Sequence, residues 1–190
     1  MFFLRKKKSH WEAMSSILQS TNYLERKSIK LYTESGVLLS PSDHVFFQDL
    51  TANVDKIVKD GRPESKTVTR ISKDDQGTYW VLIRDEDFTE LISTTYTVIN
   101  AVSNIVKSDN IIGSVFKLDL TQSKVIDVYG KVESCYLIFN SDVLGYYPFV
   151  PSGEERLSSL ELDMHDILRS NGLDMLSDFN KWYGISSIPF

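Results

Sequence analysis

Few side chains in this chain have the types and spacing that a catalytic or metal site requires. The three histidines, His10, His44 and His165, are scattered along the sequence. The H-E-x-x-H, C-x-x-C and G-x-x-x-x-G-K-[ST] patterns are all absent. No serine lies in a nucleophile-elbow context, and no pair of residues demands an acid–base role. We therefore expect a protein that is not an enzyme and that has no cofactor or metal.

The single cysteine, Cys135, lies in the middle of a predicted apolar strand. One cysteine excludes an intrachain disulfide and a multi-cysteine metal site. A catalytic cysteine needs an electropositive, partly exposed setting, which this stretch does not offer. We interpret Cys135 as a core residue of a protein in a reducing, cytoplasmic compartment.

Four carboxylates, Asp85, Glu86, Asp87 and Glu90, cluster after an apolar run and could bind a cation. The same residues are typical of a helix start. Asp87 is a suitable N-cap, and Glu90 stands three residues later, as a capping box requires. Acidic groups at this end also interact favourably with the helix dipole. We favour the structural interpretation of the cluster.

The first eight residues place an apolar wedge before a basic cluster. The residues concerned are Phe2, Phe3, Leu4, Arg5, Lys6, Lys7 and Lys8. One interpretation is a contact with an anionic membrane surface, and the other is a solvated terminus. The order differs from that of a secretory signal, in which basic residues precede the apolar segment. We treat residues 1–10 as an N-terminal arm and 11–190 as one domain.

The overall charge argues against nucleic-acid binding. Lys and Arg number 21 against 26 Asp and Glu, which gives a formal net charge of −5. Hydrophobic residues make up 42% of the chain, which is ordinary for a globular domain. No apolar run approaches the roughly 18 residues of a membrane span.

The elements that must position these side chains centre on residues 77–94. The apolar run 79–83 predicts a buried strand, and apolar spacing from Phe88 to about Lys107 predicts a long helix. Residues 67–71 and 79–84 bracket a polar loop that ends in Gly77, which predicts a β-hairpin.

The remaining elements are read from the same periodicities. Helices are expected over 11–19, 50–58 and 157–168, the last opened by a capping box of Ser152 and Glu155. Residues 34–36 (Glu-Ser-Gly) are interpreted as a turn. Short strands are expected at residues 29–33, 45–47, 114–120, 125–129, 134–139 and 146–150.

This order predicts an α+β fold: a single domain with a mostly antiparallel sheet and helices packed on one face. The element order resembles that of the secretion-chaperone-like fold. An aromatic C-terminal tail that includes Trp182 is expected to pack back on the domain or to meet a partner. Dimerisation through a sheet edge or through this tail stays open.

Several stretches together resemble the PspA-associated protein PspAB family, whose members are small proteins of archaea and actinobacteria. The leucine-rich last helix and Trp182 correspond to that family as well. The matching segments are residues 79–82, 85–94, 113–116, 136–140 and 147–153.

The resemblance implies a role beside PspA, a coiled-coil, membrane-remodelling protein of envelope-stress responses. It also implies association, at gene-neighbourhood level, with an HtpX-type membrane metalloprotease. The family supplies no catalytic residues. We therefore expect a non-enzymatic adaptor or chaperone-like protein in the cytoplasm, peripheral at the inner face of the membrane.

Two alternatives stand beside this expectation. The first is a small-ligand-binding protein or enzyme with a site between sheet and helices. The second is a peripheral lipid-binding protein that acts through the N-terminal arm. The residues predicted to line a pocket or partner surface are Trp80, Asp87, Tyr136, Tyr146, Tyr147 and Trp182.

Overall fold

A computed structural model describes residues 8–60, 64–185 and 187–190 of the chain. Its centre is a six-stranded antiparallel sheet in the order β2-β3-β1-β4-β5-β6. The strands are β1 (Lys30–Leu39), β2 (Val68–Lys73), β3 (Tyr79–Arg84), β4 (Ile111–Asp119), β5 (Ser134–Asn140) and β6 (Gly145–Phe149). A small hairpin, β7 (Pro151–Ser152) and β8 (Glu155–Arg156), follows.

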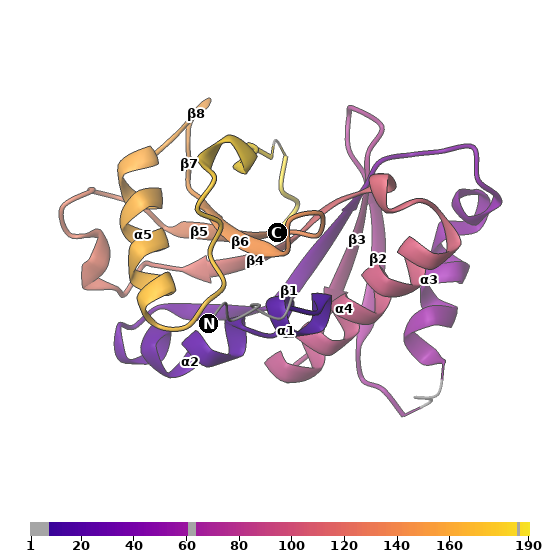
Figure 1. Cartoon of the computed structure of the whole chain (residues 1–190), viewed down its shortest axis with the longest axis horizontal. Coiled ribbons are helices and arrows are strands. Elements are labelled where there is room, and N and C mark those ends of the chain that lie inside the picture. Colours follow the sequence, from indigo (N-terminus) through magenta and orange to yellow (C-terminus); the bar gives the residue numbers. More distant parts are fainter. Residues whose placement is uncertain (1–7, 61–63, 186) are drawn as a thin grey trace, which may run out of the picture.

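Among the described residues, the helices that pack on the sheet lie on one of its faces (Figure 1). This confirms the predicted α+β architecture. The α-helices are α1 (His10–Met14), α2 (Ile17–Arg26), α3 (Leu50–Lys59), α4 (Phe88–Ile105) and α5 (Ser158–Ser170). The short 3-10 helices are η1 (Val45–Asp49), η2 (Ser108–Asn110), η3 (Lys124–Ile126) and η4 (Phe179–Lys181).

The opposite face of the sheet is covered by part of the C-terminal tail, the name used here for residues 173–185 and 187–190. The tail side chains that pack on this face are Leu176, Trp182, Ile185, Ile188 and Phe190. Trp80, Val115 and Ile138 are buried on this face, and Trp182 and Phe190 of the tail pack against the same cluster. Successive strand residues point to opposite faces, so each central strand supplies both cores. This two-sided burial explains why strands such as β3 and β5 read as unbroken apolar runs.

The tail also closes one edge of the sheet. Tyr146 of β6 forms a parallel β-bridge with Met175 of the tail. The Tyr146 N–H donates to Asp174 O at 2.7 Å, and the Tyr146 carbonyl accepts from Leu176 N at 2.7 Å. Pro148 lies in this outer strand, where a missing N–H costs least. The prediction that Pro148 marks an edge or strand end is thereby confirmed.

The predicted N-cap of the long helix is confirmed, but the capping box with Glu90 is not shown, because the Asp87 N–H donates to the Asp85 carboxylate at 2.9 Å. The Asp87 carboxylate accepts from Thr89 N at 2.7 Å and from Glu90 N at 3.1 Å. The hairpin of β2 and β3 also forms, with Gly77 at φ 87° in its loop. Asp74 accepts from the N–H groups of Gln76 and Thr78 and so orders that loop.

The predicted turn at Glu34-Ser35-Gly36 is wrong, because these residues lie inside the ten-residue strand β1. Gly36 is required there by packing rather than by a turn. A Cβ atom at position 36 would lie 2.7 Å from the Trp80 ring and 2.9 Å from the Phe190 ring. Long-range packing, which local turn propensity does not register, thus places this glycine.

Two predicted strands are also wrong. Residues 45–47 form part of η1, because the His44 ring nitrogen accepts from Phe46 N at 3.2 Å and tightens the chain. Within 125–129 the structure has η3 and turns, with the Ser123 hydroxyl accepting from Val125 N at 3.3 Å. Side-chain hydrogen bonds to the local backbone compete with sheet pairing in both places.

The predicted capping box of Ser152 and Glu155 is wrong as well. Ser152 pairs with Glu155 across the β7–β8 hairpin, and Gly153 takes the turn at φ 64°. The helix α5 begins later, at Ser158, and Leu157 at its N-cap contributes no side-chain hydrogen bond. Its end at Asn171-Gly172 is as expected, with Gly172 at φ 95°.

Most of the predicted N-terminal arm, residues 1–7, lies outside the described residues. Lys8 is described, and its ammonium group forms an ion pair with Asp174 of the tail. Helix α1 begins at His10 after a Ser9–Glu12 capping box. None of the helices in the described ranges combines the length and apolarity of a membrane span.

Candidate functional site

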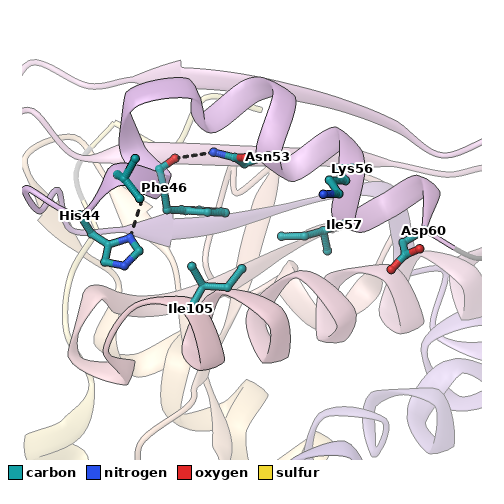
Figure 2. Close-up of a pocket in the computed structure, with 8 residues that line it drawn as sticks. His44, Phe46, Asn53, Lys56, Ile57, Asp60 and Ile105 are labelled. Carbon is teal, nitrogen blue, oxygen red and sulfur yellow. Dashed lines mark hydrogen bonds between the residues drawn. The ribbon is translucent and has the colours of Figure 1, made fainter.

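A groove opens between α3 and the C-terminal end of α4 (Figure 2). Its volume is about 370 Å³. The groove residues are His44, Val45, Phe46, Asn53, Lys56, Ile57, Asp60 and Ile105.

One end of the groove is shaped by η1. The His44 ring caps this turn through Phe46 N, and Asn53 of α3 donates to Phe46 O at 3.0 Å (Figure 2). These bonds fix η1 against α3. The Phe46 side chain is thereby buried, whereas Val45 is left 65% exposed at the mouth of the groove.

The floor and walls are apolar. Figure 2 shows Ile57 of α3 and Ile105 of α4 pointing toward one another across the groove. Ile105, on the last turn of α4, is a large apolar side chain that is 43% exposed. Clustered exposed apolar groups of this kind mark sites where another apolar surface can dock.

The rim of the groove carries charge of both signs. Lys56 and Asp60 line it from the last turn and C-cap of α3. Lys59 nearby forms an exposed i,i+4 pair with Asp55 at 3.8 Å. The groove therefore combines an apolar centre with a mixed, solvated rim, which is the usual anatomy of a protein-binding surface.

The groove residues do not form a catalytic arrangement. No serine, threonine or cysteine lines it, and His44 lies at the opposite end from Asp60 (Figure 2). The His44 Nδ1 atom is already used by Phe46 N. Within the described ranges there is also no group of three or more His, Cys, Asp or Glu residues that could hold a metal ion. The geometry suits docking rather than acid–base chemistry.

The aromatic residues singled out from the sequence lie elsewhere, and most of them hold the tail. The Tyr136 hydroxyl donates to Phe190 O at 3.1 Å, and the Tyr147 hydroxyl donates to Tyr183 O at 3.1 Å. The Trp182 ring stacks on Tyr147 at 6.0 Å between centroids. Burial raises the pKa of the Tyr147 hydroxyl.

Trp80 joins this group, whereas Tyr146 and Asp87 do not. Trp80 is buried under the tail, with its ring edge-on to Phe190. Tyr146 points to the helix-covered face, where its hydroxyl donates to Met14 O at 2.5 Å and burial raises its pKa well above the ordinary value. Asp87 caps α4 at the surface. The six residues therefore do not converge on one site.

Beneath α4, the interface between sheet and helices is filled by side chains. Val81 and Ile83 of β3 and Ile92 and Ile99 of α4 are all fully buried. Such packing leaves no room for a substrate beneath the middle of α4. At the start of α4, however, Phe88 lines a cavity of about 410 Å³ with Leu24, Ile29 and Leu31, so the alternative of a ligand site between sheet and helices stays a prediction.

The other candidate groups also have structural partners. Asp85 accepts from the Thr67 hydroxyl and from Asp87 N. Cys135 is fully buried, and this burial raises the pKa of its thiol, which disfavours the reactive thiolate. His165 is buried against Trp182, with its Nδ1 atom 2.9 Å from Asp166.

Sequence periodicity did not single out the groove. Ile57 of α3 packs partly against the helix-side core as well as lining the groove, and Val45 lies in η1 rather than in the strand expected at residues 45–47.

Comparisons with known proteins give one positive result. A family model described as PspAB, PspA associated protein B, matches residues 5–190. No curated protein and no solved structure matches the chain significantly.

Proposed function

The chain belongs to the PspA associated protein B family, and on that premise we propose that it is a non-enzymatic adaptor that binds a PspA-type coiled-coil protein. The match over residues 5–190 carries this proposal, because the family is described by its association with PspA. The groove between α3 and α4 supplies a surface of suitable chemistry.

We place the contact at this groove because its form suits a helix of a coiled coil. An amphipathic helix presents apolar side chains at i, i+3 and i+4, flanked by charges. The apolar lining of the groove consists of Val45, Phe46, Ile57 and Ile105. Charges of both signs lie beside it, on Lys56 and Asp60. A helix laid along the groove would bury one or two side chains in it.

The groove alone supports a weak contact. Burying one Leu or Ile side chain contributes roughly 1.5–3 kcal/mol. A specific complex usually buries more than about 1,000 Å² in total, so surface around the groove must take part. A partner that presents many copies of one helix would raise the apparent affinity without new contacts.

The cellular setting follows from the same premise. A partner of a membrane-stress protein is expected in the cytoplasm, peripheral at the inner face of the membrane. The basic N-terminal arm is compatible with an anionic surface but lies mostly outside the described residues. Release of the purified protein from anionic vesicles by salt would check this placement.

The proposal is tested by calorimetric titration of the full chain with the PspA-type protein of the same source, at two salt concentrations. Val45→Asp and Ile105→Glu are the groove variants. The matched controls are Val128→Asp and Leu162→Glu, since Val128 is 85% exposed and Leu162 is 45% exposed. We expect at least a tenfold loss of affinity for the groove variants only.

Two outcomes would contradict the proposal at different levels. Absence of binding by the wild-type chain at both salt concentrations would remove the partner. Binding that groove and control variants weaken equally, or not at all, would keep the partner but move the contact to another surface.

A further inference from the structure

At the end of the molecule remote from the groove, three cationic side chains surround a second cavity. Its volume is about 510 Å³, and it is lined by Arg26, Lys27, Ser28, Gln122, Lys124 and Val125. We propose that this cavity binds a phosphate-bearing ligand. The inference is independent of the partner-binding groove.

Sheet pairing brings the two walls of this cavity together. One wall is the end of α2 and the turn into β1, and the other is the loop after β4. Lys30 at the start of β1 pairs with Asp119 at the end of β4. The segments that flank this pair, residues 26–28 and 122–125, are therefore held side by side.

The first wall ends in a strained position. Ile29 N donates to Leu24 O at 2.9 Å and Ser28 N donates to Glu25 O at 3.0 Å, which closes α2. Ser28 has φ 55°, a conformation that glycine adopts without strain and that residues with a Cβ atom rarely adopt. The serine adds a hydroxyl to the cavity wall that glycine would lack.

The second wall is held by local hydrogen bonds. Ser123 N donates to Leu120 O at 2.9 Å, and the Ser123 hydroxyl accepts from Val125 N at 3.3 Å. These bonds set the course of the loop between Gln122 and Lys124. The loop thus contributes Gln122 and Lys124 to the cavity lining, from a segment that is distant in sequence from α2.

The charge of the cavity is not balanced by its own lining. No carboxylate lines it, and Arg26, Lys27 and Lys124 form no ion pair with any other residue that the structure describes. Cations at the end of α2 are favoured by the helix dipole, which accounts for Arg26 and Lys27. It does not account for Lys124, which comes from another segment.

Phosphate fits this donor set. Guanidinium and ammonium groups bind phosphate oxygens through charge-assisted hydrogen bonds, and hydroxyl and amide groups add neutral donors. Ser28 also lines a neighbouring apolar cavity of about 410 Å³ with Leu24, Ile29, Leu31 and Phe88. A phosphate joined to an apolar chain could contact both, so the source is either a lipid headgroup or a soluble phosphate compound.

The test uses the full chain and two probes. Inorganic pyrophosphate is titrated by calorimetry, and flotation is measured with vesicles of phosphatidylglycerol and phosphatidylcholine. The cavity variant is the triple change Arg26→Gln, Lys27→Gln, Lys124→Gln. The matched control removes the same charges elsewhere, through Lys66→Gln, Arg70→Gln and Lys107→Gln, all of which are exposed.

We expect the wild-type and control proteins to bind at least one probe, and the cavity variant to bind it at least tenfold more weakly. Lys124→Glu alone, on an exposed turn, should also weaken binding and guards against misfolding of the triple variant. Loss of pyrophosphate binding identifies a soluble ligand, and loss of flotation identifies a headgroup.

The proposal is overturned if the wild-type protein binds neither probe, or if the cavity and control variants lose binding equally. It is also overturned if the cavity variant binds pyrophosphate as the wild type does and flotation disappears only on deletion of residues 2–8, because the arm would then be the membrane contact.

Discussion

The Arg156 guanidinium lies 2.8 Å from the Glu161 carboxylate, which is only 2% exposed, and so pairs a charge that α5 buries. On its other side, Arg156 donates to Trp182 O at 3.1 Å. Glu161 in turn accepts from Val150 N at 2.8 Å. This pair therefore joins Val150, which follows β6, to β8, α5 and the C-terminal tail in one network.

Replacing Arg156 should destabilise the fold more than its partial exposure suggests. Arg156→Met leaves Glu161 buried without its charged partner, which costs about 3 kcal/mol. The measurement is the free energy of unfolding in urea. Lys59→Met is the control, since it breaks the exposed pair with Asp55 and should cost less than about 0.5 kcal/mol. A loss below about 1 kcal/mol for Arg156→Met would show that the network does not need the pair.

Gly36→Ala tests the packing of Phe190 of the C-terminal tail against the sheet. The added methyl group would overlap the rings of Trp80 and Phe190, at 2.7 Å and 2.9 Å, so we expect a loss of about 1–3 kcal/mol. The same change made in a Phe190→Ala background should cost less, because one of the two rings is gone. Urea unfolding of the two single variants and the double variant measures this coupling. If the losses of unfolding free energy in the two single variants add up to that of the double variant, Phe190 does not pack against position 36.

Asp87→Ala should weaken the start of α4. The carboxylate caps two N–H groups, and loss of such a cap costs about 0.5–2 kcal/mol. Asp87→Asn retains an acceptor and should lie close to wild type. Glu86→Ala, at the exposed neighbouring position, is the control. Thermal unfolding gives the comparison, and equal effects of the two alanine variants would contradict the capping role.

His10 should make the protein less stable in mild acid. Burial against Phe139 and Tyr96 lowers the pKa of its imidazole below 6.5. As the pH falls below about 6.5, the unfolded chain binds the proton before the folded chain does, so folding stability is lost until the lower folded pKa is passed.

The check is urea unfolding of wild type and His10→Phe at pH 7.5 and pH 5.5. The loss between the two pH values should be smaller in the variant than in the wild type. An unchanged loss in His10→Phe would assign the acid sensitivity to other groups.

The sequence by itself determined the elements whose signals are local. The N-cap at Asp87, the glycine-ended loop at Gly77 and the alternation along β4 depend on residues a few positions apart. These contacts do not depend on the tertiary structure, so their sequence patterns can be recognised without knowledge of the fold. The ordered set of family segments led to the same family that the model match shows.

Only the tertiary structure decided which glycine lies in a turn and which glycine makes room for packed side chains. Gly36 and Gly153 read alike in sequence, yet Gly36 lies in a strand under Trp80 and Gly153 takes a positive φ in a hairpin. The docking of the tail, the exposed side of Ile105 and the meeting of Lys124 with Arg26 likewise depend on strand order. Such contacts join residues far apart in the chain, and no local pattern encodes them.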